Sequence, residues 1–173
     1  MTDDLRERIL KIKLVVFDVD GVLTDGRIVL GNYGDELKFF DVQDGLGIVR
    51  LRRAGLKTAL VTSRKSRINH RRAREMDVTK LYQNVSDKRK VFDKILRKFR
   101  LDAAEACFVG DDLMDIPALA RAGLAVAVQN AVPAVKEIAH YVTEKSGGRG
   151  AAREISDLLL NTQGRSDAPV PKD

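Results

Sequence analysis

The chain contains no tryptophan, one cysteine and two histidines among its 173 residues. A single cysteine excludes an internal disulfide, and we interpret Cys107, in the apolar run Ala-Cys-Phe-Val, as a buried and inert thiol. His70 and His140 lack the spacing of metal ligands. No run approaches the roughly 20 apolar residues of a membrane-spanning helix, and residues 1–8 lack the apolar segment of a signal peptide. We therefore expect a cytoplasmic protein without a membrane partner.

Aromatic residues are also scarce, at 5% of the chain, while the net charge is +6. A positive surplus suits either a nucleic acid or an anionic small molecule. Residues 64–74 carry six Lys or Arg but no Phe, Tyr or Trp on which bases could stack. A nucleic-acid-binding module is thus the weaker alternative, and we expect a small anionic partner.

Apolar residues at 44% and charged residues at 32% fit a folded chain of ordinary domain size. After an amphipathic lead-in over 4–12, strand and helix patterns alternate. The expected strands are 13–17, 57–61, 80–82, 106–109, 124–128 and a short one near 140–143, and the expected helices are 45–54, 66–76, 88–100, 113–121, 132–138 and 150–161. This alternation predicts an α/β fold, a Rossmann-like, doubly wound and mostly parallel sheet with helices on both faces. We expect one domain over 1–163 and a flexible tail over 164–173.

One segment breaks the alternation. Residues 27–30 and 37–40 have strand character and flank Gly-Asn-Tyr-Gly-Asp at 31–35, where the chain is expected to turn. This pattern predicts a β-hairpin inserted directly after the first strand.

The first strand carries the most informative feature, because it ends in two aspartates, Asp18 and Asp20. A buried strand normally avoids carboxylates, since an unpaired buried charge is very costly. The carboxyl ends of the strands are also where open α/β sheets bind ligands. Two carboxylates at this position, followed by the turn residue Gly21, indicate a site that holds a cation.

Three further polar segments follow later strands or open a helix. They are Thr62-Ser63-Arg64, Lys88, and the run with Asp111, Asp112 and Asp115. Each alone is commonplace, because threonine and aspartate often cap helices and lysines are usually solvated. Together they bring carboxylates to one sheet edge, where oxygen ligands suit Mg²⁺, and add a lysine and a hydroxyl that can hold an anion. Such a set predicts a phosphoryl-transfer site.

These four segments resemble the four motifs of the haloacid dehalogenase superfamily over nearly the whole chain. The resemblance implies that Asp18 is a nucleophile that forms an aspartyl-phosphate, and that Asp20 is the general acid for the leaving alcohol and then the base for water. It also implies that Thr62 and Lys88 hold the phosphoryl oxygens. An aspartate at position 20 favours the phosphatase branch of that superfamily.

The same resemblance implies a magnesium site. Its ligands would be Asp18, the main-chain carbonyl of Asp20, and Asp111. Asp115 would orient Lys88 and the metal waters, and Asp112 would support the loop.

Larger members of the superfamily insert a cap domain between the motifs. The interval from Asp20 to Thr62 here holds only the hairpin and one helix, and the interval from Lys88 to Asp111 holds one helix and one strand. We therefore expect no cap domain. Because an acyl-phosphate site benefits from excluding water, either a large substrate or a neighbouring subunit would cover it.

Four stretches resemble the 3-deoxy-D-manno-octulosonate 8-phosphate (KDO 8-phosphate) phosphatase family: residues 18–26, 44–48, 110–117 and 147–154. The resemblance implies hydrolysis of that sugar-acid phosphate in lipopolysaccharide precursor synthesis, by a homotetramer assembled through the hairpin. Open alternatives are a phosphatase of a nine-carbon sugar-acid 9-phosphate and a catalytically idle partner domain. The chain has Ser63 where the family commonly has glycine, which would strain the loop if φ there were positive.

Substrate contacts implied by this resemblance are Asp20, Asp41, Val42, Gln43, Asp44, Gly45, Arg64, Arg72 and Lys88. The helical pattern supports Arg72 independently, because it falls between Ile68 and Met76 on the apolar side. An inward arginine needs an anion, either a sugar-acid carboxylate or a structural salt-bridge partner. The glycines of 147–150 form either a flexible connector or a loop whose backbone approaches the substrate or a neighbouring chain.

Overall fold

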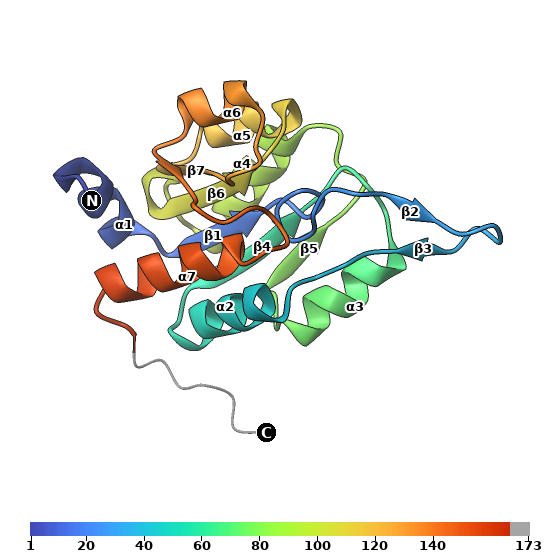
Figure 1. Cartoon of the computed structure of the whole chain (residues 1–173). Coiled ribbons are helices and arrows are strands. Elements are labelled where there is room, and N and C mark those ends of the chain that lie inside the picture. The colour runs from blue at the N-terminus through green and yellow to red at the C-terminus, as the bar shows by residue number, and fades with distance from the viewer. Residues whose placement is uncertain (167–173) are drawn as a thin grey trace.

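A six-stranded parallel sheet forms the middle layer of the computed structural model, which describes residues 1–166 (Figure 1). In spatial order its strands are β5 (Lys80–Tyr82), β4 (Lys57–Val61), β1 (Leu14–Phe17), β6 (Ala106–Gly110), β7 (Leu124–Ala127) and β8 (Tyr141–Val142). Every neighbouring pair in this sheet is parallel. The first strand, β1, lies in the middle of the sheet. Strands β4 and β5 extend the sheet on one side of it, and β6, β7 and β8 extend it on the other.

Helices cover both faces of the sheet, which confirms the predicted doubly wound α/β fold (Figure 1). On one face lie α2 (Val42–Arg53), α3 (Arg67–Glu75) and α7 (Ala151–Thr162), and on the other lie α4 (Lys88–Phe99), α5 (Ile116–Leu119) and α6 (Pro133–Ile138). The N-terminal helix α1 (Asp3–Lys11) packs against α7.

Two helices differ from the sequence prediction by more than one residue at an end. Helix α2 begins at Val42 rather than residue 45, because the Asp41 carboxylate accepts a hydrogen bond from the Gln43 amide at 2.7 Å and so caps it. The predicted helix 113–121 is divided into a 3-10 turn η2 (Leu113–Asp115) and the short α5. A second 3-10 turn, η1 (Ala103–Glu105), precedes β6.

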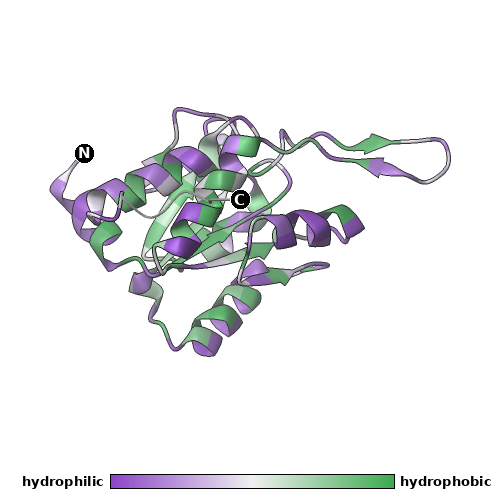
Figure 2. Cartoon of the chain, turned by 90° about the horizontal axis from the view of Figure 1, so that it is seen from below, coloured by the Kyte–Doolittle hydropathy of each residue, from purple (hydrophilic) through white to green (hydrophobic). Residues whose placement is uncertain are grey.

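The core lies between the sheet and both helix layers. Strands β1 and β6 are buried along their whole length, and Phe92 of α4 packs edge-on against Phe108 at 5.7 Å between ring centroids. Figure 2 shows this as apolar strands inside and hydrophilic outer helix faces. Cys107 is fully buried in β6, and burial raises the pKa of its thiol, which agrees with its interpretation as inert.

The predicted hairpin is confirmed as β2 (Val29–Leu30) and β3 (Glu36–Leu37), an antiparallel pair that projects away from the body of the molecule (Figure 1). Its apolar side chains are exposed in the single chain: Ile28, Leu30, Tyr33, Leu37 and Phe39. Tyr33 at the tip is 99% exposed.

At the other end of the chain, residues 164–166 continue from α7, with the Arg165 amide donating to the Leu160 carbonyl at 2.8 Å. The expected flexible tail extends to residue 173, and its part after residue 166 lies outside the described residues. Within residues 1–166, no helix is long and apolar enough to cross a membrane.

Candidate active site

Three carboxylates and one ammonium meet at the carboxyl ends of β1 and β6. Asp18 follows β1 directly, and its amide donates to the Val109 carbonyl of the neighbouring strand at 3.0 Å. Asp111 follows β6, so the parallel pairing of these strands brings the two side chains together. One oxygen from each of Asp18, Asp111 and Asp115 lies within 4.8 Å of the others. We call these three residues and Lys88 the acidic floor.

Asp115 organises the floor. Its Oδ2 accepts hydrogen bonds from the Asp111 and Asp112 amides at 3.0 and 3.2 Å, and its Oδ1 accepts one from Lys88 Nζ at 2.5 Å. Gly110 makes room for it, because a Cβ there would lie 2.6 Å from the Cβ of Asp115. Asp115 therefore holds the loop after β6 and the lysine, and its implied role of orienting Lys88 and the metal waters stays a prediction.

Lys88 is the first residue of α4 and is buried between two carboxylates. Its Nζ lies 2.8 Å from Asp18 Oδ1 as well as 2.5 Å from Asp115, and 3% of its side chain is exposed. Burial alone would lower the pKa of Lys88, but Asp18 and Asp115 outweigh it and raise that pKa. The lysine is thus a fixed positive charge beside Asp18.

The floor still carries more negative than positive charge. Burial, followed by the charge of Asp115, raises the pKa of Asp18 well above its usual range, and the same two causes raise that of Asp111 to about 7. Asp111 Oδ1 is buried without a hydrogen-bond partner. Clustered carboxylate oxygens, one of them unpartnered, fit a hard divalent cation such as Mg²⁺.

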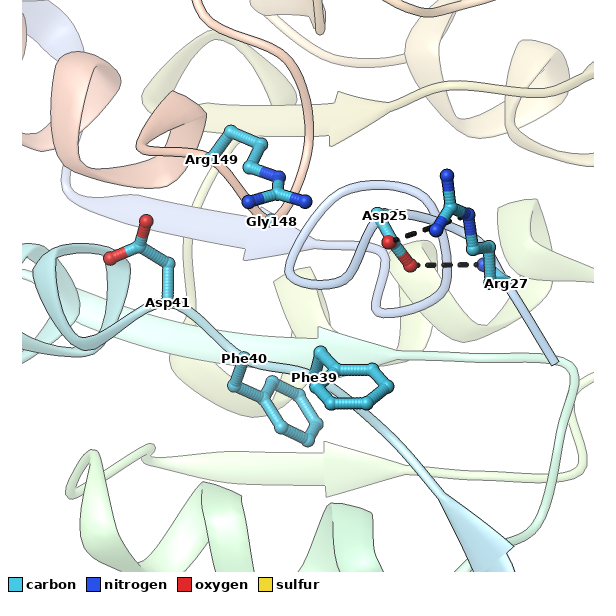
Figure 3. Close-up of a pocket in the computed structure, with 7 residues that line it drawn as sticks. All are labelled: Asp25, Arg27, Phe39, Phe40, Asp41, Gly148 and Arg149. Atoms are coloured by element: carbon cyan, nitrogen blue, oxygen red, sulfur yellow. Dashed lines mark hydrogen bonds and ion pairs between the residues drawn. The ribbon is translucent and has the colours of Figure 1, made fainter. Parts of the chain in front are cut away.

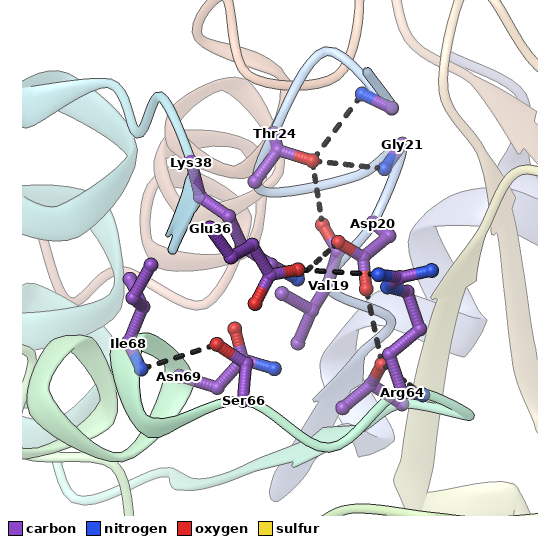
Figure 4. Close-up of polar contacts among 12 residues, drawn as sticks. Val19, Asp20, Gly21, Thr24, Glu36, Lys38, Arg64, Ser66, Ile68 and Asn69 are labelled. Atoms are coloured by element: carbon purple, nitrogen blue, oxygen red, sulfur yellow. Dashed lines mark hydrogen bonds and ion pairs between the residues drawn. The ribbon is translucent and has the colours of Figure 1, made fainter. Parts of the chain in front are cut away.

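Asp20 lies on the other side of the β1 loop. Its Oδ2 accepts a hydrogen bond from Thr62 Oγ1 at 3.2 Å, and its Oδ1 is paired with the Lys38 ammonium (Figure 4). Thr62 Oγ1 also accepts the Arg64 amide at 3.2 Å, so the loop after β4 is tied to Asp20. The sequence prediction missed Lys38, because nothing in its strand pattern shows that the hairpin base folds back onto Asp20.

Glu36 of β3, which pairs with Leu30 beside the turn and was also missed, forms a salt bridge with Arg64 at 3.3 Å (Figure 4). Burial opposes ionisation of Glu36, but hydrogen bonds from Ser66 and Arg64 and the charge of Lys38 together lower its pKa. The hairpin is therefore fastened to the site at two points, Lys38 and Glu36.

A cavity of about 180 Å³ opens above these groups. Its lining residues are Asp18, Asp20, Thr62, Ser63, Arg64, Lys88, Asp112 and Met114. The structure thus brings all predicted catalytic side chains to one cavity. Among the residues that the structure describes, Ser63 does not have a positive φ, so a serine causes no backbone strain in this loop.

A second cleft of about 360 Å³ adjoins Lys38, and we call it the arginine cleft. It is lined by Lys38, Phe40, Val42, Ile68, Arg71, Arg72 and Glu75. Arg72 donates to the Asp41 carbonyl at 2.9 Å and to Glu75 at 3.3 Å, and stacks over the Phe40 ring at 5.6 Å. Its Nε is buried with no partner.

Gly45 of α2 makes room for Arg72, because a Cβ there would lie 2.3 Å from the guanidinium. The structure therefore brings two of the predicted substrate contacts, Val42 and Arg72, to one cleft, with Gly45 packed against Arg72. Glu75 is already a salt-bridge partner of Arg72, so both alternatives for this arginine, a substrate anion and a structural pair, keep an observation in their favour.

The other predicted contacts of this segment face elsewhere. The buried Asp44 carboxylate accepts hydrogen bonds from the Gly150 and Arg153 amides at 3.2 and 2.9 Å and so caps α7. Burial raises the pKa of Asp44 to about 6, against these hydrogen bonds. Gln43 lines a separate cleft with Arg149 and Arg153.

Asp41 lines that cleft too, and a further one of about 390 Å³ together with Asp25, Arg27, Phe39, Phe40, Gly148 and Arg149 (Figure 3). Arg149 and Asp41 face each other across it, and Arg27 is paired with Asp25. None of Asp41, Gln43 and Asp44 therefore lines the cavity that holds Asp18.

The glycine-rich segment 147–150 packs against the loop that follows Asp20. A Cβ on Gly147 would lie 1.7 Å from the Gly21 carbonyl oxygen, and Gly148, at φ +63°, donates its amide to the Val22 carbonyl at 2.9 Å. These glycines thus allow two backbones to touch and support the catalytic loop. This contact is neither of the two roles expected from the sequence.

A family model of haloacid dehalogenase-like hydrolases matches residues 65–155. The 3-deoxy-D-manno-octulosonate 8-phosphate phosphatase of Yersinia pestis is 42% identical over 163 residues, which are 94% of this chain and 87% of that protein. Its crystal structure superposes with a TM-score of 0.94 at 41% identity, covering 96% of this chain and 90% of that one. The Moraxella catarrhalis phosphatase of the same name, crystallised with a magnesium ion, a phosphate ion and KDO, gives a TM-score of 0.94 at 35% identity, covering 97% of each chain.

Proposed function

The chain belongs to the haloacid dehalogenase-like hydrolases, and on that premise we propose that it hydrolyses KDO 8-phosphate to KDO and inorganic phosphate, a step towards lipopolysaccharide. The observation that carries the proposal is the acidic floor, in which Asp18 lies against Lys88 with Asp20 and Thr62 on the same cavity. The identity of 42% to the Yersinia pestis phosphatase supports the substrate.

In the first half of the reaction, an oxygen of Asp18 attacks the phosphorus atom and the bond from phosphorus to the sugar oxygen breaks. Lys88, 2.8 Å from Asp18, holds the nucleophile and offers its one remaining hydrogen to a phosphoryl oxygen. Asp20 gives its proton to the departing sugar oxygen, so the alcohol leaves neutral.

In the second half, water attacks the phosphorus of the aspartyl-phosphate and restores the Asp18 carboxylate. Asp20 is then ionised and takes a proton from this water, which returns it to its starting state. Thr62, which donates to Asp20 Oδ2 at 3.2 Å, keeps this carboxyl directed at the cavity.

Asp18, Asp111 and the main-chain carbonyl of Asp20 would hold Mg²⁺. The ion, when bound, neutralises charge on the phosphoryl group during transfer. Asp115 belongs to the carboxylate cluster, but both oxygens of Asp115 already accept hydrogen bonds from Lys88 and the loop amides, which favours a supporting role. Asp112 caps Leu113 at 2.7 Å and stays at the rim.

We place the sugar acid in the arginine cleft. Arg72 has a buried Nε without a partner, and a guanidinium can bind a carboxylate through two parallel hydrogen bonds. Val42 and Phe40 would contact the carbon skeleton, and Arg64 stands at the rim of the phosphate cavity.

The test is a phosphate-release assay with purified protein, MgCl₂ and a panel of sugar phosphates. We expect KDO 8-phosphate to give the highest kcat/KM in the panel. The panel includes nine-carbon sugar-acid 9-phosphates, because a preference for one of them would replace the substrate while keeping the chemistry. Absence of magnesium-dependent phosphate release from every sugar phosphate would contradict the proposed function.

We also propose that the protein is a cytoplasmic homotetramer. The exposed apolar side chains of the hairpin, among them Leu30, Tyr33 and Phe39, support assembly through this segment. No cap domain lies between the motifs, so a neighbouring subunit would supply the cover. Light scattering should give four times the mass of the 19.2 kDa chain, and a fully active monomer would contradict this.

A further inference from the structure

At the hairpin base a buried lysine, Lys38, contacts Asp20, and this lysine belongs to none of the four motifs. Lys38 follows β3 directly, and 3% of its side chain is exposed, while 21% of the Asp20 side chain is. An ammonium removed from water in this way needs an oxygen that accepts its hydrogen bond, since an unpaired buried charge is very costly. Asp20 Oδ1 supplies it (Figure 4).

Asp20 is therefore held by one donor on each oxygen. Lys38 binds Oδ1, and Thr62 donates to Oδ2 at 3.2 Å. With both oxygens restrained, the plane of the carboxyl group is fixed relative to Asp18, and proton transfer depends on such placement within hydrogen-bond reach. Lys88 does the corresponding work for Asp18, so each of the paired aspartates has its own lysine.

Lys38 also lies where two spaces meet. It lines the arginine cleft while its ammonium contacts Asp20, which lines the phosphate cavity. The sugar oxygen that leaves phosphorus must pass between these two spaces if the sugar acid occupies the cleft. Lys38 is thus positioned beside the atom that receives the proton.

On these grounds, and resting on the proposed phosphatase reaction, we propose that Lys38 is the positioning residue for the general acid Asp20. It holds the acid on the leaving oxygen during the first half-reaction and takes no part in the attack by Asp18. Proton donation matters most for poor leaving groups, because a good leaving group departs without it. The fall in kcat/KM when Lys38 is removed should therefore grow with the basicity of the leaving group.

The experiment compares wild type with Lys38→Met across a series of aryl phosphates whose phenols become steadily less acidic, using kcat/KM, which reports the steps up to departure of the phenol. We expect little loss for p-nitrophenyl phosphate and a loss of about 10–100-fold for unsubstituted phenyl phosphate, part of the 10²–10⁴-fold that general acid catalysis provides. Lys38→Arg, which keeps the positive charge, should restore most of the rate.

The matched control is Lys57→Met, the same substitution at an exposed lysine that begins β4, at the end of the strand away from Thr62. It should leave kcat/KM unchanged for every aryl phosphate in the series. A purely structural role for Lys38 predicts an equal loss for every phenol together with a lower melting temperature, and this result would overturn the proposal. So would a loss confined to the sugar substrate, because it would make Lys38 a sugar contact only.

The aryl series is independent of the sugar. Failure on KDO 8-phosphate with a positive aryl result would therefore refute the proposed substrate and leave the role of Lys38 standing.

Discussion

The acidic floor and the arginine cleft lie side by side but are built differently. The floor comes from the ends of two buried strands and the first turn of α4, and Asp18, Lys88 and Asp115 are each 5% exposed or less. The cleft comes from the sides of α2 and α3 and the hairpin base, and Val42 on its rim is 81% exposed. Buried strand ends hold the proposed catalytic groups, whereas helix sides and a surface segment hold the proposed recognition groups.

This difference predicts two kinds of response. Changes in the floor should alter kcat, and those that remove its ammonium should also lower stability, because the buried carboxylates would lose their partner. Changes in the cleft should alter KM with little effect on stability.

The largest effect is expected for Asp18→Asn. An amide cannot form the phosphorylated intermediate, so kcat should fall by about 10⁴-fold or more, the scale seen when a nucleophile is removed. The substitution also removes a carboxylate whose ionisation in the folded state is disfavoured by burial, so the melting temperature without magnesium should be unchanged or higher. Activity assays and calorimetry on the same sample check both. Near-wild-type turnover would refute covalent catalysis by Asp18.

Lys88→Met should be nearly as damaging and should also destabilise the fold. Two buried carboxylates, Asp18 and Asp115, would lose their common ammonium partner, at a cost of about 3–5 kcal/mol. Urea unfolding measures this cost. Lys98→Met, at an exposed position on the same helix, is the control and should change stability by less than about 0.5 kcal/mol. Equal stability of the two variants would show that the floor is not electrostatically coupled.

Magnesium should stabilise the protein in a pH-dependent way. Asp111, with its pKa raised from 3.8 to about 7, binds its proton more tightly when folded, so metal-free stability falls as pH rises from about 4 to 7. The ion competes with that proton, so saturating Mg²⁺ should raise the melting temperature by roughly 5–10 °C at about pH 8 and by much less at about pH 5.5.

Asp111→Asn is the matched control for this measurement. It should lose most of the magnesium response at both pH values, because one charged ligand is gone. An equal response of the wild type at the two pH values would contradict the assignment of Asp111 as a ligand.

In the cleft, Arg72→Lys should raise KM for the sugar-acid phosphate by about 10–100-fold with kcat little changed, since a bidentate charged contact contributes about 1.5–3 kcal/mol. Arg71→Lys is the control on the next residue, whose side chain is 85% exposed against 19% for Arg72. The measurement is steady-state kinetics of both variants. A rise in KM of equal size in both would remove the specific role of Arg72.

The smallest effect is expected for Asp44→Ala, which removes a cap from α7 and should cost about 1–2 kcal/mol. Because the pKa of Asp44 is raised to about 6, its ionisation opposes folding, so the cost should be larger at about pH 5 than at pH 8. Thermal unfolding at both pH values checks this. A large rise in KM without loss of stability would restore Asp44 to the substrate-binding set.

Strands and helices were predictable because their signals are local. Buried apolar runs and helical periodicity place every strand of the sheet to within two residues, and the hairpin follows from its turn residues. The division of the predicted helix 113–121 was not predictable. It depends on Asp115 turning inward to Lys88, 27 residues earlier, instead of continuing the helix.

The candidate site was predictable in part for a related reason. Parallel strands align their carboxyl ends, so aspartates that follow β1 and β6 must meet, and the resemblance supplied their roles. Lys38 and Glu36 were missed, because the direction in which the hairpin leaves the sheet is set by packing and not by its own sequence. The resemblance implied a substrate contact for Asp44, which stays a prediction, while its hydrogen bond from the Gly150 amide, 106 positions later, is a contact that no local pattern encodes.

The order of apolar and polar residues along this chain determined a parallel sheet with aspartates at its ligand-binding edge, since strand periodicity and turn chemistry act over a few neighbours. Only the tertiary structure decided which hydrogen-bond donor faces which carboxylate: Lys88 for Asp18, Lys38 for Asp20 and the amides at the start of α7 for Asp44. The physical reason is that each buried charge must find a partner within a few ångströms, and distance in space is fixed by packing of the whole core.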